Sequence, residues 1–203
     1  MNGVKVKICG LTRAADVDLA LGAGADVVGF IFARSPRQLA AATGASLAKR
    51  AAGRALRVGL FMDQEASQVQ PVIDAVALDL LQFHGSEPNE FCRSFGLPFI
   101  KAISMLDESA DRAILSYPDA EGILLDSHVP GGAGGTGQTF DWNRPVASDK
   151  PIWLAGGLNP DNVAEAVRLF QPYAVDVCSG VESAPGLKDQ DRVRNFITNA
   201  KQA

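Results

Sequence analysis

The amino-acid sequence predicts an α/β protein that folds as a single-domain (β/α)8 barrel, or TIM barrel, of eight parallel strands. Apolar runs of strand length alternate with segments of helical periodicity along the whole chain. The apolar runs are nearly continuous, which is typical of parallel strands that helices cover on the outside. Similar tetrapeptides also open the even-numbered strands at residues 26, 79, 121 and 176, about 50 residues apart, the length of two strand–helix units.

The main alternative to a barrel is an open, doubly wound sheet. Its usual sequence signature is a glycine-rich dinucleotide-binding motif directly after the first strand. No such motif follows the first strand here, and eight strand–helix units are the number that closes a barrel. The barrel is therefore the preferred fold.

Composition restricts the kind of partner. The chain has 203 residues, of which 47% are hydrophobic and 21% are charged, so it can bury a core and form one domain over residues 1–203. Its net charge is −4 without any block of like charges, which argues against nucleic acid and membrane surfaces as partners. No apolar run approaches the roughly 20 residues of a membrane span. We expect a cytoplasmic protein that acts on a small soluble molecule.

The cysteines do not form a metal-binding pattern. Cys9, Cys92 and Cys178 lie far apart in the sequence and are accompanied by only two histidines. These spacings exclude the usual zinc sites. We expect free thiols and no metal.

The first strand, residues 4–9, alternates apolar and polar side chains. Its apolar face would pack against helices, and its other face would place Lys5, Lys7 and Cys9 in an enclosed polar space. A lone intracellular cysteine is most often a small buried hydrophobe. The two cations on the same face favour a reactive thiol instead. Thr12 is expected to cap the helix that follows.

Seven further strands are predicted from apolar runs bounded by turn residues. They are expected at residues 26–32, 56–61, 79–83, 98–103, 122–126, 151–155 and 174–178. The first helix, with Ala14, Val17 and Leu21 on its buried stripe, ends at residues 22–24.

Helical periodicity predicts the elements between the strands. The second helix begins at Thr43. The third contains Pro71, which should bend or shorten it. A short helix from Pro88 directs Cys92 into the core, and a fifth helix follows from Ala110.

The last two helices have clearer signals. Asn159 is expected to cap the helix after the seventh strand, with Pro160 in its first turn. Between the sixth and seventh strands the chain instead forms a glycine-dense loop, residues 127–139. The buried stripe of the final helix consists of Val193, Phe196, Ile197 and Ala200.

In a parallel barrel the carboxyl ends of all strands meet on one rim, where the catalytic residues of this fold lie. The polar residues and glycines that follow the strands there are Cys9, Arg34, Arg37, His84, Asp126, Gly156, Gly157, Ser179 and Gly180. Cys9 follows the first strand and Asp126 ends the sixth, so the thiol and the carboxylate face each other across the mouth. A small ring-shaped substrate fits between them.

Glycines after the seventh and eighth strands favour a phosphate site. Gly156, Gly157, Ser179 and Gly180 offer backbone N–H groups to an anion, and residues 180–182 would begin a short helix whose N-terminus attracts anions. The loops after strands seven and eight are the usual phosphate site of this fold. The alternative is ordinary loop glycine, but two adjacent loops of the same kind favour phosphate.

Seven segments make the chain resemble the phosphoribosylanthranilate isomerases of tryptophan biosynthesis. They are Lys7-Ile8-Cys9-Gly10, Ser35-Pro36-Arg37, Gln82-Phe83-His84-Gly85, Leu124-Leu125-Asp126-Ser127, Gly134-Gly135-Thr136-Gly137, Leu154-Ala155-Gly156-Gly157-Leu158-Asn159-Pro160 and Ser179-Gly180-Val181-Glu182. Each is weak alone, but together they follow the family order over the whole chain. The chain departs from the family pattern at Phe83, where leucine is usual, and at Gln138, where lysine is frequent. Both departures affect loop details and leave the chemistry unchanged.

The resemblance implies an Amadori rearrangement, an aldose–ketose isomerisation that needs no metal or cofactor. Protonation of the ribose ring oxygen opens the sugar of N-(5-phosphoribosyl)anthranilate to an iminium ion, which makes the C2 proton acidic. Asp126 and Cys9 match the acid and the base of the family. Burial should raise the pKa of Asp126 so that it keeps its proton, whereas the Cys9 thiol should lose its proton. Arg37 matches the residue that holds the anthranilate carboxylate, and His84 is a candidate for lining the pocket.

Other classes of barrel stay open. Indole-glycerol-phosphate synthase usually carries an extra N-terminal helical segment, whereas here the first strand starts by Val4. The histidine-pathway isomerase performs the same rearrangement with an aspartate in place of Cys9. A non-catalytic phosphate-binding barrel would keep the glycine loops and would have no reason to keep an opposed thiol and carboxylate. The expected partner is a phosphorylated small molecule, bound by a monomer or a homodimer.

Overall fold

A computed structural model describes residues 3–106, 109–127 and 139–203 of the chain. Eight parallel strands form a closed barrel in sequence order, so that the last strand pairs with the first. This arrangement confirms the predicted fold class. The strands are β1 (Lys5–Ile8), β2 (Val27–Ile31), β3 (Leu56–Phe61), β4 (Leu80–Phe83), β5 (Phe99–Ser104), β6 (Gly122–Asp126), β7 (Ile152–Leu154) and β8 (Ala174–Val177).

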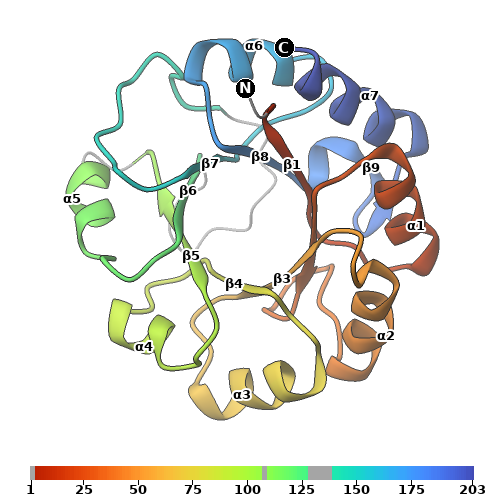
Figure 1. Ribbon diagram of the computed structural model, residues 1–203, viewed down its shortest axis with the longest axis vertical. Coiled ribbons are helices and arrows are strands. Elements are labelled where there is room, and N and C mark those ends of the chain that lie inside the picture. The colour runs from red at the N-terminus through yellow and green to blue at the C-terminus, as the bar shows by residue number, and fades with distance from the viewer. Residues whose placement is uncertain (1–2, 107–108, 128–138) are drawn as a thin grey trace.

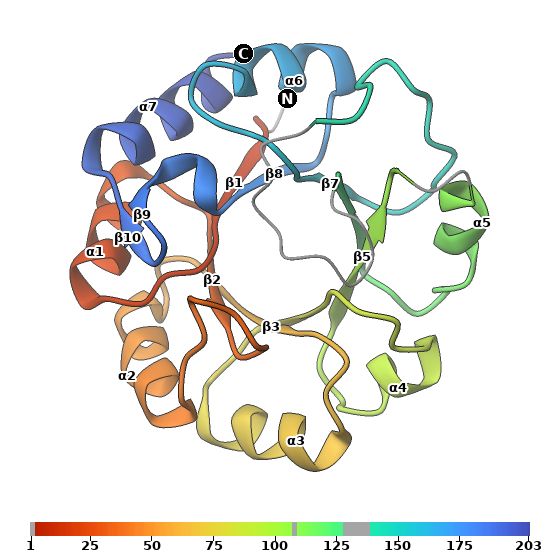
Figure 2. The ribbon, with the colours of Figure 1, turned by 180° about the vertical axis from the view of Figure 1, so that it is seen from behind.

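Helices surround the barrel and cover its outside (Figure 1). Those in the described ranges are α1 (Ala14–Ala23), α2 (Ala41–Ala51), α3 (Ala66–Ala75), α4 (Asn89–Arg93), α5 (Ala110–Leu115), α6 (Val163–Phe170) and α7 (Gln190–Lys201). The sequence did not predict the hairpin of β9 (Glu182–Ala184) and β10 (Leu187–Lys188), which follows the 3-10 turn η1 (Ser179–Val181). Seen from behind, this hairpin lies beside the β1 and β2 side of the barrel (Figure 2).

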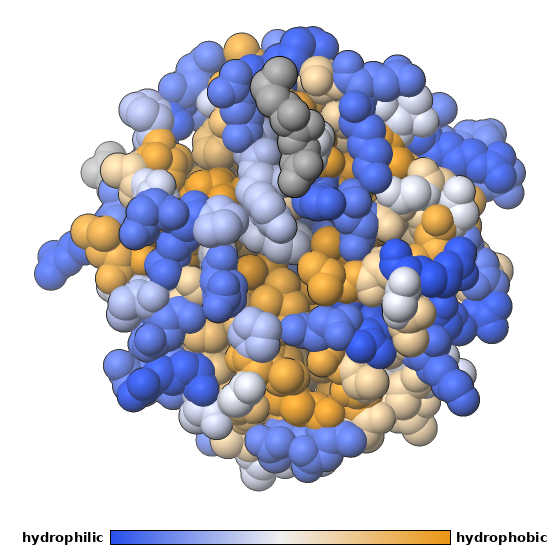
Figure 3. Space-filling model, viewed as in Figure 1, coloured by the Kyte–Doolittle hydropathy of each residue, from blue (hydrophilic) through white to orange (hydrophobic). Residues whose placement is uncertain are grey.

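Two apolar layers hold the barrel together. The outer layer, between strands and helices, contains Val6 and Ile8 of β1 and the predicted stripe of α7. The inner layer includes Val27, Leu80 and Ala174, the first residues of β2, β4 and β8. The interior is therefore apolar towards the amino ends of these strands and leaves the carboxyl ends for polar groups. On the face of the molecule in Figure 3, hydrophilic side chains surround an apolar area near the centre.

The start of α1 differs from the prediction. Thr12 does not cap the helix, because the residue at its N-cap is Arg13, and Thr12 Oγ1 instead donates to Gly186 O at 2.6 Å. Ala14 is exposed, whereas Val17 is buried as expected. Thr12 thus ties the start of α1 to the hairpin.

The helix signal at Asn159 also needs correction. Asn159 accepts from the backbone N–H groups of Asp161 and Asn162 at 2.8 and 3.2 Å, as a capping residue does, but it caps the turn of residues 160–162 that leads directly into α6, which begins at Val163. In α3, Pro71 is accommodated inside the helix, which continues to Ala75. No helix in the described ranges is long and apolar enough to cross a membrane.

The repeated tetrapeptides begin at the same place relative to their strand in three cases and not in the fourth. Asp26, Asp79 and Glu121 directly precede β2, β4 and β6, respectively. Asp26 Oδ2 accepts from the backbone N–H of Val6 at 2.9 Å, which anchors the strand start. Asp176 is instead the third residue of β8 and lies inside the barrel. The tetrapeptide at residue 176 is therefore out of register with the other three.

Candidate active site

β1 carries a lysine into the interior of the barrel. Lys7 is fully buried, and its Nζ donates to Gln82 Oε1 at 2.9 Å and to Asp176 Oδ2 at 3.0 Å. Its ammonium has three donors, and it also shares a side-chain hydrogen bond with Cys9. Burial opposes its charge, but Asp176 and Cys9 together raise the pKa of Lys7. A buried cation therefore lies beside the thiol, as the alternation of β1 predicted.

Cys9 follows β1 and is only 3% exposed. Its backbone N–H donates to Val177 O at 2.8 Å. Gly29 on β2 leaves room for its sulfur, since a Cβ there would lie 2.8 Å from Cys9 Sγ. A hydrogen bond with Cys178 lowers the pKa of Cys9 to about 7, while burial opposes this shift and the charge of Lys7 adds to it. Much of the thiol is therefore ionised near neutral pH.

Asp126 ends β6, and its side chain is 17% exposed. Its Oδ2 lies 3.4 Å from His84 Nε2, and His84 Nδ1 lies 3.0 Å from Gln82 Nε2. Because Gln82 Oε1 accepts from Lys7, the amide nitrogen donates to His84 Nδ1. A neutral His84 then carries its proton on Nε2, which faces Asp126. A series of polar contacts thus joins the lysine beside the thiol to the carboxylate.

A buried lysine holds the loop that carries His84. Lys101 of β5 is 1% exposed, and its Nζ donates to Gly85 O at 2.6 Å and to Phe83 O at 3.3 Å, on either side of the histidine. Glu87 forms an ion pair with this lysine, with its Oε2 3.6 Å from Lys101 Nζ. The imidazole is therefore positioned from outside the barrel as well as from inside.

Arg37, after β2, pairs with a carboxylate that the sequence analysis did not single out. Its Nε and Nη2 donate to Oε1 and Oε2 of Glu182 at 2.8 and 2.5 Å, and Lys188 Nζ donates to the same Oε1 at 2.9 Å. Burial opposes the charge of Glu182, but the two cations together lower its pKa. A guanidinium has five N–H donors. Arg37 therefore keeps donors beyond the two that Glu182 accepts.

The glycine loops after β7 and β8 pack against each other. Gly156 and Gly157 have φ angles of 81° and 66°, in the left-handed region that favours glycine. A Cβ on Gly156 would collide with Ser127 Oγ, and one on Gly180 would collide with Leu158 O. All three glycines are half-buried, so their backbone remains accessible to a ligand.

The predicted short helix after β8 is only partly present. The helical turn η1 starts at Ser179, and Glu182 enters β9 instead of continuing the helix. This change of direction brings the Glu182 carboxylate to Arg37. The signal for a helix was misread because the hairpin after it has strands of only three and two residues.

Some predicted cations lie away from this site. Lys5 was expected inside the barrel, but it sits at the amino end of β1, 43% exposed, and pairs with Asp26 at 3.6 Å. Arg34 is exposed. Residues 134–137, which supported the resemblance, and Gln138, which departs from the family pattern, lie outside the described residues. Among those that the structure describes, no group of three or more His, Cys, Asp or Glu residues can hold a metal ion.

Gln82 and Asp176 were not predicted as site residues, although the sequence carries a signal for both. Each interrupts an otherwise apolar strand, and a polar residue in such a strand requires a buried partner. Glu182 and Lys188 carried no such signal, because they belong to the hairpin that was not predicted.

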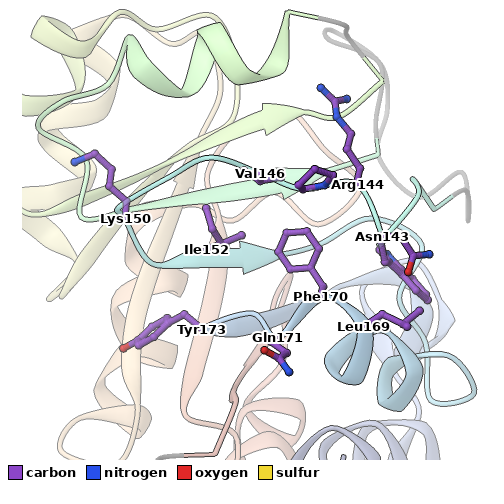
Figure 4. A pocket seen from close by; sticks show the side chains of 11 residues that line it. Asn143, Arg144, Val146, Lys150, Ile152, Leu169, Phe170, Gln171 and Tyr173 are labelled. Carbon is purple, nitrogen blue, oxygen red and sulfur yellow. The ribbon is translucent and has the colours of Figure 1, made fainter.

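The cavity in Figure 4 is separate from these residues. It measures about 360 Å³ and lies between the crossover from β6 to β7 and the end of α6. Trp142, Val146, Lys150, Ile152 and Phe170 are among its lining residues. Ile152 is the first residue of β7, so the cavity lies away from the strand ends that carry Cys9 and Asp126.

Comparison with known proteins gives a consistent result. A family model described as N-(5'-phosphoribosyl)anthranilate (PRA) isomerase matches residues 6–199. The N-(5'-phosphoribosyl)anthranilate isomerase of Cellvibrio japonicus is 47% identical over 206 residues, which cover 100% of this chain and 96% of the relative.

Solved structures agree with this match. One is a phosphoribosylanthranilate isomerase in complex with reduced 1-(o-carboxyphenylamino)-1-deoxyribulose 5-phosphate, with a TM-score of 0.84 and 36% identity over 98% of this chain and 100% of the other. Another shows monomers generated from the dimeric phosphoribosylanthranilate isomerase of Thermotoga maritima, with a TM-score of 0.84 and 35% identity at the same coverage.

Proposed function

The chain belongs to the N-(5'-phosphoribosyl)anthranilate isomerase family, and from this premise we propose which residues carry out its reaction. The enzyme converts N-(5'-phosphoribosyl)anthranilate to 1-(2-carboxyphenylamino)-1-deoxyribulose 5-phosphate in tryptophan biosynthesis. We assign Asp126 as the general acid and Cys9 as the general base. The observation that carries this assignment is the ionisable thiol of Cys9 on the same rim as the Asp126 carboxylate, three strands away around the ring.

The two groups act in sequence on the sugar. Asp126 donates a proton to the ribose ring oxygen, the bond from that oxygen to C1 breaks, and the anthranilate nitrogen supplies the electrons of an iminium ion. The Cys9 thiolate then removes the C2 proton, and the released electron pair forms the C1–C2 double bond and neutralises the nitrogen. Tautomerisation of this enol to the ketone completes the product. Proton exchange restores the Asp126 acid and the Cys9 thiolate.

The neighbouring groups support these roles. Lys7 stabilises the thiolate by its charge, and His84 Nε2–H orients the Asp126 carboxyl group. Arg37 holds the anthranilate carboxylate with the donors that Glu182 leaves available. The backbone N–H groups of the loops with Gly156, Gly157, Ser179 and Gly180 hold the phosphate.

Asp126→Asn tests the acid. The amide keeps the shape of the side chain but cannot donate the proton, so kcat should fall by roughly two to four orders of magnitude with KM little changed. Turnover is followed as the loss of fluorescence after phosphoribosylanthranilate is added. Near-normal turnover would remove Asp126 from its role, and binding without turnover in the unmodified protein would indicate a binding module.

Arg37→Ala tests whether Arg37 binds the anthranilate carboxylate of the substrate. It should reduce kcat/KM by the equivalent of about 2–4 kcal/mol of transition-state binding. Arg34→Ala is the matched control, because this neighbouring arginine is exposed. Inorganic phosphate should compete with substrate in all three proteins. An Arg37→Ala enzyme with unaltered efficiency, or non-competitive inhibition by phosphate, would contradict this layout.

We further propose that residues 1–203 act as one catalytic domain in the cytoplasm, as a monomer or a homodimer. The candidate site residues all come from one barrel, so a single chain can form the site. A reducing compartment suits the free thiols of Cys9, Cys92 and Cys178. Light scattering at the concentration used for kinetics decides the oligomeric state.

A further inference from the structure

Cys178 has no role in the reaction described above, yet its side chain adjoins the proposed base. It follows β8 and packs against the cluster of Cys9, Ile31 and Ala33. Each of the two thiols is the largest influence on the pKa of the other. The backbone bond from Cys9 N–H to Val177 O fixes the two chain segments in this register.

Gly10 makes this approach possible. Its φ is 69°, and a Cβ at this position would lie 2.7 Å from Cys178 Sγ. The side chain of Cys178 therefore occupies the space that a larger residue at position 10 would need. This side chain is thus directed towards the cluster that contains Cys9.

The charges around the two thiols leave one positive charge unmatched. The buried or largely buried cations are Lys7 on β1, Arg37 after β2 and Lys188 on β10, and the carboxylates are Asp176 on β8 and Glu182 on β9. Lys7 and Asp176 act on Cys9, Arg37 and Lys188 act on Cys178, and Glu182 pairs with both Arg37 and Lys188. Ionisation of one thiol brings the cluster to neutrality, whereas ionisation of both would leave it with an excess negative charge.

The hydrogen bonds decide which thiol keeps the proton. Cys9 sulfur accepts from Lys7, whose other two protons go to Gln82 and Asp176. Lys188 Nζ makes its short bonds, at 2.9 Å, to Glu182 Oε1 and to the backbone oxygen of Cys178, and it lies 3.9 Å from Cys178 Sγ. The negative charge therefore belongs on Cys9, and Cys178 retains its proton.

We propose that Cys178 is a positioning residue for catalysis: its thiol donates a hydrogen bond to the sulfur of Cys9 and holds Cys9 as the thiolate in the free enzyme. The proposal rests on the assignment of Cys9 as the base. The pKa directions agree with it, since the bond to Cys178 is the largest influence that lowers the pKa of Cys9, and the same bond raises the pKa of Cys178. A base whose pKa lies near the working pH is the most effective.

The test compares Cys178→Ala, which removes the donor, with Cys178→Ser, which keeps a donor of similar size. The rate at which iodoacetamide modifies Cys9 is measured as a function of pH, by mass mapping of the peptide that contains Cys9. The pH profile of kcat/KM is measured for the same proteins. We expect a midpoint near pH 7 in the unmodified enzyme, an upward shift of about one unit or more in Cys178→Ala, and a return towards pH 7 in Cys178→Ser. Below the midpoint such a shift lowers kcat/KM about tenfold, and the loss disappears at high pH.

The outcomes separate the two hypotheses. The role of Cys178 would be overturned if the alkylation midpoint of Cys9 were equal in Cys178→Ala and in the unmodified enzyme. It would also be overturned if Cys178→Ala and Cys178→Ser shifted that midpoint equally. A shifted alkylation midpoint with an unshifted kcat/KM profile would overturn Cys9 as the base instead. Cys178→Val, a somewhat larger side chain that has no donor and leaves no cavity, repeats the test if alanine disturbs folding, as judged by circular dichroism.

Discussion

At the scale of single residues, the barrel interior contains a lysine that water cannot reach. Lys7 keeps its charge because Gln82, Asp176 and Cys9 accept its three protons. The alternation of β1 was sufficient to predict that Lys7 and Cys9 face inward. It could not identify the partners of Lys7, because Gln82 and Asp176 lie 75 and 169 residues away along the chain. Such pairings depend on the closed ring, which local sequence does not describe.

The three thiols should differ in reactivity. Burial raises the pKa of Cys92 to about 12, and the bond to Cys9 raises that of Cys178, whereas the pKa of Cys9 is lowered to about 7. The thiolate population of Cys9 grows as pH rises through this value. Iodoacetamide should therefore modify Cys9 first, with activity lost in proportion and bound product analogue slowing both.

Mass mapping beside residual turnover checks this order. Cys9→Ser should be folded and nearly inactive, because a serine hydroxyl is far too weak an acid to ionise near neutral pH. Prior modification of Cys92 or Cys178, or full alkylation of Cys9 in an enzyme that still turns over, would show that the base lies elsewhere.

At the scale of elements, the ends of helices were predicted less well than their buried faces. The stripe of α7 was predicted fully because apolar periodicity reflects burial directly. Thr12 looked like a cap, but its hydroxyl bonds to a hairpin of five strand residues that no pattern indicated. Asn159 has the bonds of a cap and still precedes the regular helix. Capping residues predict a turn of backbone, and tertiary contacts decide whether a helix continues from it.

The cap of α7 offers a quantitative test at this scale. Asp189 Oδ1 accepts from the backbone N–H groups of Asp191 and Arg192 at 3.0 and 2.9 Å. Asp189→Ala should lower the free energy of unfolding by about 1 kcal/mol, measured by urea denaturation. Asn195→Ala is the control, because this residue is exposed in the middle of the same helix and should change stability little. Equal effects of the two substitutions would show that the cap does not stabilise α7.

At the scale of the whole molecule, the count of eight strands and the order of the ring were predictable from sequence, because each strand–helix unit carries its own apolar pattern. The crossover between β6 and β7 has no helix among residues 127 and 139–151, and the glycine-dense loop predicted at residues 127–139 lies almost wholly outside the described residues. The cavity beside α6 borders this crossover. Its lining residues carried no motif, since a cavity results from the packing of distant segments.

The pairing of β8 with β1 also has a kinetic consequence. This seam joins the two ends of the chain, and contacts between distant residues carry the greatest loop-closure cost, so we expect it to form after the folding transition state. Val175 of β8 is fully buried in the outer layer. Val175→Ala should accelerate unfolding in stopped-flow experiments and leave the refolding rate nearly unchanged. Leu81→Ala, on the more locally paired β4, is the comparison and should slow refolding. A refolding rate that falls as much in the first variant as in the second would mean that the ring closes early.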